Sequence, residues 1–333
     1  MDTLRIGIVG LGRLGRVHAE NIACKIPGAR LTAACTTRPE TVEFARQLGG
    51  TALYTNFNQM LSEAEMDAVA VISTSSEHCW QIAAALDAGK HVFSEKPLGV
   101  DLDQCLQAQA AVERHPELTF MLGFMRRYDP SYAYAKKQID SGVIGTPYLV
   151  KATGLDPEAV VEDAIRFCKN SGGIFLDAGI HDIDLMRWFL GSEAEEVYAL
   201  GATFKHPEFR QAGDDETGLA VFRFKNGGMG TIHVGRTCPY GYHVETEIVG
   251  TEGTLRISAV PEKNLTGSTV PAASGPSVWP PSRSGSGRRT CWRCRSSWTA
   301  SAPGESPAQP SMTASAPPLW ATPLQRPGAP AVR

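Results

Sequence analysis

The sequence predicts an α/β protein with two domains: a doubly wound parallel sheet, and then an α+β domain with a mostly antiparallel sheet. Up to about residue 124, apolar strand-like runs alternate with helix-length segments, which is the pattern of βαβ units. Gly10, Gly12 and Gly15 directly follow the first of these runs. After residue 125, strand-like runs follow one another with turn residues between them, as in antiparallel sheets.

The first predicted domain covers residues 1–124. Short apolar runs bounded by Gly, Pro or polar residues are typical of buried strands, and longer segments with apolar positions three or four apart are typical of helices. The predicted strands are 4–9, 29–36, 66–74, 91–97 and 118–125, and the predicted helices are a segment ending near residue 25, then 39–48, 77–88 and 101–112.

The second predicted domain covers residues 125–265. Asp129 and Pro130 form a helix start, because Asp caps a helix well and Pro fits its first position. Residues 145–154 are strand-like, and Asp177–Leu190 is a predicted helix that Gly191 ends. From residue 197 to residue 257 strand-like runs continue, with a hairpin expected at 226–227.

Composition restricts the function classes. The chain has 333 residues, 42% of them hydrophobic and 20% charged, as in an ordinary globular protein. No apolar run reaches the roughly 18 residues of a membrane span, and no leader-like segment opens the chain. The eight cysteines form no disulfide framework, and the one Cys-x-x-Cys, at residues 291–294, has no second pair. We therefore expect free thiols, a cytoplasmic location and no metal. A net charge of −9 over residues 1–270 argues against nucleic acid as a partner.

The glycine loop predicts a dinucleotide site. Glycine allows a tight turn, close approach of the backbone to a pyrophosphate and close packing of helix on strand. The N–H groups that open the following helix then face the anion, and Arg13 and Leu14 stand at this point of the loop. We therefore expect Gly10, Gly12, Arg13, Leu14 and Gly15 to bind NAD(P) in a Rossmann fold.

The end of the second predicted strand bears on the choice between NAD and NADP. NAD sites usually carry Asp or Glu here, where it binds the ribose 2′-OH. This chain has Cys-Thr-Thr-Arg at residues 35–38, so no carboxylate repels a 2′-phosphate. We expect Thr36 and Arg38 to contact the cofactor, with a preference for NADP or dual use; the alternative is that Arg38 is only a solvated side chain. Further predicted cofactor contacts are Ser73, Ser75, His78, Glu95 and Lys96, with His78 near the cofactor but not catalytic.

Three residues fit the oxidation of an alcohol. Asp177 and His181 are four apart in a predicted helix, hence on one face, where a carboxylate can orient the imidazole and raise its basicity. A histidine accepts a proton near neutral pH. Lys96 ends a predicted parallel strand, the edge where such folds bind ligands, and its ammonium can polarise the reacting oxygen.

Four segments carry a family resemblance: the glycine loop, "SEKPLGVDL" (94–102), "GFMRRYDPSY" (123–132) and "GGIFLDAGIHDIDLMRWFLG" (172–191). Together they resemble the glucose–fructose oxidoreductase, inositol dehydrogenase and MocA (Gfo/Idh/MocA) family over residues 3–258. "GFMRRYD" and "YGYHVETEIVG" are most similar to inositol 2-dehydrogenases. The resemblance implies an NAD(P)-dependent oxidation of myo- or scyllo-inositol to the ketone by hydride transfer.

The resemblance also implies roles for single residues. Lys96, Asp177 and His181 match the family's catalytic and substrate-binding set, and Arg127, Asp156 and Tyr240 match further polyol-binding positions. An exposed face of the C-terminal sheet would suit a dimer or tetramer. Two alternatives stay open: a dehydrogenase of another sugar, and a non-enzymatic regulator that binds NAD(P).

Residues 266–333 do not fit the rest of the chain. Residues 271–333 hold 12 of the 22 Pro and four of the six Trp, and seven Arg against one Glu give this segment a net charge of +6. We interpret it as the product of a frameshift in a GC-rich gene, with the slip around residues 260–285, and expect it to be irregular and disordered. A chain altered in this way would be less stable and could lack activity, which is a third interpretation.

Overall fold

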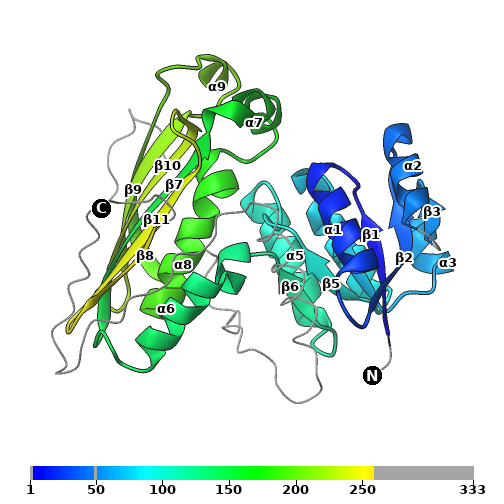
Figure 1. Cartoon of the computed structure of the whole chain (residues 1–333), viewed down its shortest axis with the longest axis horizontal. Helices are drawn as coiled ribbons and strands as arrows, with labels where there is room; N and C mark the ends of the chain where they lie inside the picture. Colours follow the sequence, from blue (N-terminus) through cyan, green and yellow to red (C-terminus); the bar gives the residue numbers. More distant parts are fainter. Residues whose placement is uncertain (1–2, 49–50, 259–333) are drawn as a thin grey trace. The chain divides into compact units, whose positions relative to one another are not determined.

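A computed structural model of the chain describes residues 3–48 and 51–258 (Figure 1). The described residues form two compact units that divide between Asp129 and Pro130. The interpretation of residues 266–333 as a frameshifted, disordered segment falls outside the described residues.

The first unit is built on a six-stranded sheet in which every paired strand runs parallel, in the order β3-β2-β1-β4-β5-β6. Its strands are β1 (Leu4–Val9), β2 (Ala29–Cys35), β3 (Ala52–Tyr54), β4 (Ala68–Val71), β5 (His91–Ser94) and β6 (Phe120–Leu122). Its helices are α1 (Arg13–Cys24), α2 (Pro39–Gln47), α3 (Phe57–Glu63), α4 (His78–Asp87) and α5 (Leu102–Arg114), with 3₁₀ turns η1 (Ser75–Glu77) and η2 (Met125–Tyr128).

The order of strands in this sheet places the ligand edge. The chain moves outward from β1 to β3 and then returns to the other side of β1 with β4, so the order reverses between β1 and β4. Open α/β sheets bind ligands at the carboxyl ends of the strands at such a reversal. The predicted doubly wound domain is therefore confirmed. Propensity missed β3 and α3, which are only three and seven residues long.

The second unit is built on a mixed sheet in the order β12-β11-β7-β10-β9-β8, in which only the β7–β10 pair is parallel. Its strands are β7 (Pro147–Pro157), β8 (Ala194–Ala202), β9 (Thr217–Phe224), β10 (Met229–Cys238), β11 (His243–Gly250) and β12 (Thr254–Ser258). Its helical segments are α6 (Pro130–Asp140), η3 (Glu158–Val160), α7 (Val161–Cys168), the π-helical turn η4 (Phe175–Gly179), α8 (Ile180–Leu190) and α9 (Glu208–Gln211).

Helices α6 and α8 cover one face of this sheet (Figure 1). Strand β9 alternates strictly, with Ala220, Phe222 and Phe224 buried and the residues between them exposed. Side chains on a strand alternate between its faces, so this pattern leaves the opposite face of the sheet outward. The predicted hairpin is confirmed, since β9 and β10 pair antiparallel around Gly227, which has φ 82°.

The predicted helix Asp177–Leu190 is helical throughout, but its first residues form a π-helical turn and not an α-helix. The regular α-helix α8 begins at Ile180, and Asp177 lies in the preceding π turn η4. Gly191 ends the helix in the left-handed conformation, as expected (φ 61°). Long-range polar contacts hold the π-helical turn that carries Asp177, and no local periodicity encodes such contacts.

Candidate active site

The glycine loop between β1 and α1 has the geometry that a bound dinucleotide needs. Gly10 has φ 90°, and a Cβ there would lie 2.6 Å from the backbone of Ile72 and Ser73. A Cβ on Gly15 would lie 2.0 Å from the carbonyl oxygen of Gly10, so helix and loop pack in direct contact. No atom lies within 4 Å of a Cβ built on Gly12, which leaves room at the loop for the pyrophosphate of a ligand.

The N-terminus of α1 supplies donors to this space. Arg16 is the first residue whose N–H bonds back into the helix, to Gly12 O at 3.0 Å. The N–H groups of Arg13, Leu14 and Gly15 belong to the helix's opening turn, where backbone donors have no intrahelical acceptor. A cavity of about 390 Å³ adjoins them, lined by Leu11, Gly12, Arg13, Arg16, Arg38, Glu40 and Thr41. Free donors, three guanidinium groups and open space fit an anionic dinucleotide.

The hydroxyl of Thr36, a predicted cofactor contact, forms hydrogen bonds within the turn after β2. Thr36 Oγ1 lies 2.6 Å from Thr41 Oγ1 and accepts the Arg38 N–H at 3.2 Å, which shapes the start of α2. Arg38 is exposed at the cavity. Arg16 is fixed beside it, with its guanidinium 5.3 Å from the centre of the Phe44 ring. Positive charge here therefore comes from arginines, against the single carboxylate of Glu40.

His78 joins two segments that end at the ligand edge. Its Nδ1 lies 2.7 Å from Pro97 O and its Nε2 lies 3.2 Å from Ser73 O. Burial lowers the pKa of this histidine, although both carbonyl oxygens oppose the shift. Ser73 donates its hydroxyl to Gln81 Oε1 at 2.6 Å, and Ser75 is buried in η1. His78 thus acts on the predicted cofactor site by fixing the loop after β4 against the Lys96–Pro97 peptide, which is cis.

Glu95 has a partner that the sequence did not reveal. Its Oε1 lies 2.9 Å from His18 Nε2, and both side chains are buried. His18 belongs to α1 and Glu95 follows β5, so this contact ties the helix of the glycine loop to the segment that carries Lys96. The predicted role of Glu95 at the cofactor stays a prediction. The structure adds that Glu95 holds these two segments together.

Lys96 and Arg127 belong to the first unit. Lys96 is half-buried directly after β5, at the carboxyl edge of the parallel sheet. Arg127 is half-buried in η2, which follows β6, the neighbour of β5. Adjacent parallel strands end at the same edge, so both cations stand on the ligand side of this sheet.

Asp156, Asp177, His181 and Tyr240 belong to the second unit. Cys238 at the end of β10 pairs with Pro157 at the end of β7, so Asp156 and Tyr240 lie at the same edge of the mixed sheet. Asp177 and His181 lie in η4 and the first turn of α8, which pack on β10. Tyr240 is 66% exposed and its hydroxyl lies 2.8 Å from His243 Nδ1.

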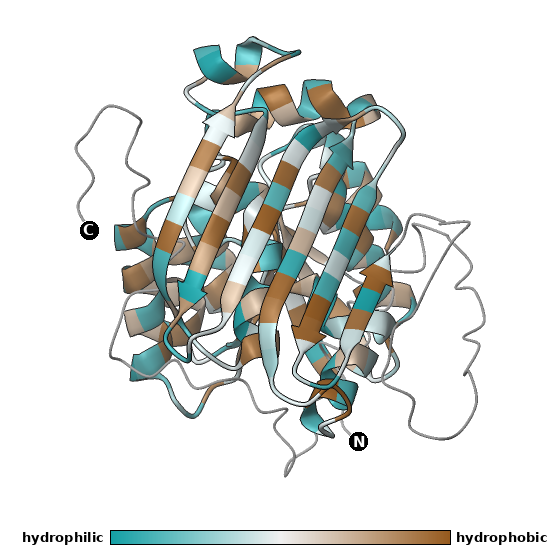
Figure 2. Ribbon diagram, turned by 90° about the vertical axis from the view of Figure 1, so that its left-hand side faces the viewer, coloured by the Kyte–Doolittle hydropathy of each residue, from teal (hydrophilic) through white to brown (hydrophobic). Residues whose placement is uncertain are grey.

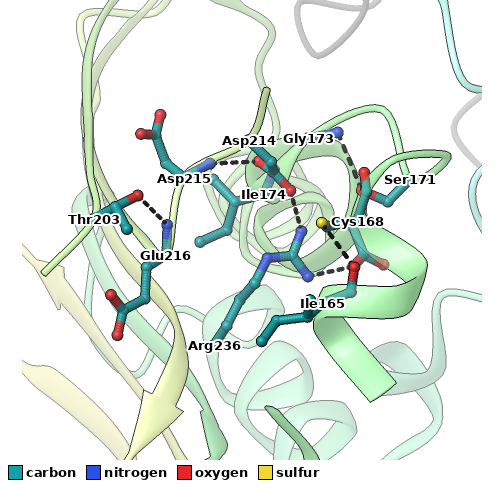
Figure 3. A network of polar contacts seen from close by, with 11 residues as sticks. Ile165, Cys168, Ser171, Gly173, Ile174, Thr203, Asp214, Asp215, Glu216 and Arg236 are labelled. Atoms are coloured by element: carbon teal, nitrogen blue, oxygen red, sulfur yellow. Dashed lines mark hydrogen bonds and ion pairs between the residues drawn. The ribbon is translucent and has the colours of Figure 1, made fainter. Parts of the chain in front are cut away.

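Arg236 is a residue that our sequence analysis missed. It is 1% exposed, and its Nη1 donates to Asp177 Oδ2 at 2.9 Å. Its Nη2 donates to Asp214 Oδ2 at 2.7 Å (Figure 3). Burial by itself lowers the pKa of this guanidinium, but the two carboxylates outweigh it and the pKa is raised. A signal was present: Arg236 continues the inward phase of Gly230, Ile232 and Val234 along β10, so period-two alternation points a charge into the core.

Glu216 is a second buried carboxylate near this site. Its Oε2 accepts the N–H groups of Phe204, Lys205 and His206 at 2.7–3.2 Å, and its Oε1 accepts the Thr237 hydroxyl at 2.6 Å. Burial alone raises the pKa of Glu216, but these donors overcome it and lower the pKa from 4.5 to about 2. The carboxylate therefore fixes the loop between β8 and α9.

We expect Glu216 to make the fold sensitive to acid. Because its pKa is depressed in the folded chain, its contribution is complete above pH 4.5 and is lost as the pH falls through about 2. The shift corresponds to about 3 kcal/mol of unfolding free energy. Urea unfolding at a series of pH values should show Glu216→Gln less stable at pH 7 and with a weaker acid dependence than the parent. The exposed Glu162→Gln is the control; equal acid slopes for Glu216→Gln and the parent would contradict the assignment.

Comparison with known proteins identifies the family. The model of the oxidoreductase family with an NAD-binding Rossmann fold matches residues 4–124, and that of the GFO/IDH/MocA C-terminal domain matches residues 132–256. The chain belongs to this oxidoreductase family. The predicted family is therefore confirmed, together with the fold class and the expectation of an NAD(P)-dependent oxidoreductase.

The similar proteins include inositol dehydrogenases. The scyllo-inositol 2-dehydrogenase (NAD(+)) of Bacillus subtilis is 37% identical over 268 residues, which is 79% of this chain and 76% of that protein. The myo-inositol 2-dehydrogenase of Thermotoga maritima is 36% identical over 79% of this chain and 77% of its own length. The solved structure of scyllo-inositol dehydrogenase from Lactobacillus casei with bound NAD(H) and scyllo-inositol is 47% identical, with a TM-score of 0.74, over 80% of this chain and 79% of that one.

The described residues contain neither a membrane-spanning helix nor a cluster of metal-ligating side chains. Across 3–48 and 51–258, no helix combines the length and apolar character needed to cross a bilayer. The same ranges contain no group of three or more His, Cys, Asp or Glu side chains placed to hold a metal ion.

Proposed function

We propose that this protein oxidises one secondary hydroxyl of myo- or scyllo-inositol to the ketone, with NAD(P) as the acceptor. The observation that supports this substrate most is the 47% identity to a scyllo-inositol dehydrogenase whose structure holds NAD(H) and scyllo-inositol. The chain also carries the two segments on which the family resemblance depends, Glu-Lys-Pro at Glu95–Pro97 and Asp-x-x-x-His at Asp177–His181.

The reaction removes one proton and one hydride from a CH–OH group, and we propose which side chains act on each. The Lys96 ammonium polarises the reacting oxygen and stabilises the alkoxide character that develops there. His181 accepts the hydroxyl proton as general base. Asp177, kept anionic by Arg236, accepts a hydrogen bond and orients the ring of the polyol or the imidazole. The nicotinamide cofactor, when bound, supplies the hydride acceptor.

Further polyol contacts complete the proposal. Arg127, Asp156 and Tyr240 donate to or accept from the remaining ring hydroxyls, which gives selectivity among stereoisomers because an unpaired buried hydroxyl is costly. Gly10, Gly12, Arg13, Leu14, Gly15, Thr36, Arg38, Ser73, Ser75, His78 and Glu95 form or support the cofactor site.

A dehydrogenase assay tests this function directly. NADH and NADPH absorbance is followed with myo-, scyllo- and D-chiro-inositol and with common hexoses, each with NAD and with NADP. We expect the highest kcat/KM for an inositol. A hexose preferred over every inositol would instead support the dehydrogenase of another sugar, and a folded protein that binds cofactor without turnover on any polyol would support the regulator.

Arg38 gives a prediction about the cofactor. If its guanidinium meets a 2′-phosphate, Arg38→Ala should weaken NADP by about 10–100-fold, as expected for one charge-assisted contact, and leave NAD nearly unchanged. Calorimetric titration of both cofactors measures this. The control is Arg46→Ala, which removes an exposed arginine from the last turn of α2, the helix that Arg38 precedes. Equal losses for NAD and NADP would exclude the contact.

We also propose that the protein is a homo-oligomer that associates through the outer face of the C-terminal sheet. Tyr198 and Leu200 of β8 lie opposite Val221 and Leu219 of β9, and all four side chains are exposed. Hydrophobic bands recur along the neighbouring strands of this sheet (Figure 2). A contiguous apolar patch of this kind is typical of an interface. Sedimentation equilibrium measures the mass, and a monomer at micromolar concentration would contradict this proposal.

A further inference from the structure

The charged side chain of Arg236 is almost completely buried. Its side chain is 2% exposed, and the ring of Phe209 in α9 lies 5.5 Å from its guanidinium carbon. An ionised group at this depth is tolerated only when paired and hydrogen-bonded. The carboxylates of Asp177 and Asp214 provide that pairing. Each accepts a hydrogen bond from a different nitrogen of the guanidinium, whose planar fork therefore spans both.

Asp214 connects this pair to the backbone of the turn that carries Asp177. Its Oδ2 accepts from Arg236, while its Oδ1 accepts the N–H of Ile174 at 2.8 Å and that of Asp215 at 2.8 Å. Ile174 is the residue before η4, and Asp177 is the middle residue of η4. The turn is thus held at its start through the backbone and at its centre through a side chain, both by the same Arg236–Asp214 unit.

The charges show what the arrangement favours. One guanidinium faces two carboxylates, so the three side chains carry a net charge of −1 when all are ionised. A buried ion pair is weak evidence for stability, because desolvation offsets much of the attraction. It does fix the position and the charge of a carboxylate, and Asp177 is the less buried of the two, with its side chain 18% exposed against 5% for Asp214.

We propose that Arg236, oriented by Asp214, is a positioning residue for the dehydrogenase reaction: it holds the Asp177 carboxylate anionic and in place on the π turn. The inference rests on the proposed function, in which Asp177 orients the polyol or the histidine. Arg236 itself touches neither polyol nor cofactor in this assignment. Its effect on catalysis passes entirely through Asp177.

That last statement is tested by a double-mutant cycle between Arg236→Gln and Asp177→Asn. Misplacing one catalytic group by about 1 Å costs about 10²-fold, so Arg236→Gln alone should lower kcat/KM for the best inositol by about 10²-fold. In a chain that already carries Asp177→Asn, the same change should cost nothing further, because the group it positions has lost its charge. The loss should divide between a higher polyol KM and a lower kcat, as in Asp177→Asn.

Two measurements separate positioning from structural damage. The NAD dissociation constant reports on the first unit and should be unchanged in every variant. Calorimetric binding of the polyol in the presence of NADH should weaken in Arg236→Gln as in Asp177→Asn. Arg166→Gln, which breaks the exposed ion pair with Asp163 on α7, is the matched control and should leave all parameters at parent values.

The outcomes distinguish the two proposals. No polyol turnover by the parent defeats the proposed function. Full activity of Asp177→Asn leaves that function standing but removes the role of Asp177, and with it the role of Arg236. An impaired Asp177→Asn together with an additive cycle, or with an unchanged Arg236→Gln, overturns the role of Arg236 alone. If Arg236→Gln does not fold, the cycle is run with Arg236→Lys, which keeps the charge but cannot span both carboxylates; it should retain part of the activity that Arg236→Gln loses, and an additive cycle with this variant equally overturns the inference.

Discussion

Lys96→Met is expected to lower kcat for inositol oxidation by about 10²–10⁴-fold, the usual contribution of a group that acts on the reacting oxygen. Methionine keeps the length and much of the volume of the side chain but removes the ammonium. No other positive charge then stabilises the developing alkoxide from this position. Steady-state kinetics under saturating NAD measure the effect, and titration of NAD should show a far smaller change in the dissociation constant than in kcat.

The control for this change lies at the other end of the same strand. Lys90 precedes β5 and donates to the carbonyl oxygen of Met66 at 3.0 Å, whereas Lys96 follows β5 at the ligand edge. Lys90→Met removes the same ammonium from the opposite edge of the sheet and should leave kcat unchanged. A Lys96→Met protein that keeps near-full activity on its best substrate would show that Lys96 does not act on the reacting oxygen.

The second large effect is expected at His181. If this imidazole takes the hydroxyl proton, His181→Ala should lower kcat by about 10²–10⁴-fold in the direction of oxidation. In the parent the rate should rise with pH as the histidine loses its proton, because only the neutral ring can act as the base. The variant should lack this rise. The measurement is the pH profile of kcat/KM over the range in which histidine titrates.

A second histidine of the same domain provides the comparison. His233 lies on the outward phase of β10, opposite Leu219, and its ring lies 3.2 Å from the Thr217 hydroxyl. His233→Ala removes the same group from the same domain and should retain both the rate and the pH profile of the parent. A pH-dependent rise that persists in His181→Ala would assign the titrating base to another residue.

Much of the fold was encoded locally. The strand Leu4–Val9 and the helix that begins at Pro130 have the predicted starts, since glycine, proline and capping residues set boundaries that are visible in the sequence. The hairpin between β9 and β10 was predicted in the same way, from the turn residues at 226–227. Short elements such as β3 and α9 escaped, because three or four residues carry too little periodicity to register.

In the candidate site, too, some residues could be predicted from the sequence and others could not. Motif and spacing were enough to predict Gly10, Lys96, Asp177 and His181, because residue type and neighbouring residues in the chain indicate the chemistry of each. Their roles in catalysis stay predictions. Their residue types and local context were available before any coordinates, and so was the absence of an acidic residue at positions 35–38.

Only the tertiary structure revealed what holds these residues. Arg236 meets Asp177 across 59 residues of sequence and Asp214 across 22, and His18 meets Glu95 across 77. The structure also shows that Asp177 lies in a π-helical turn that leads directly into α8. Sequence patterns record which side of an element is buried, because burial repeats with the period of the backbone. A single ion pair between distant segments has no period, so it emerges only when the chain has folded and the two side chains are seen together.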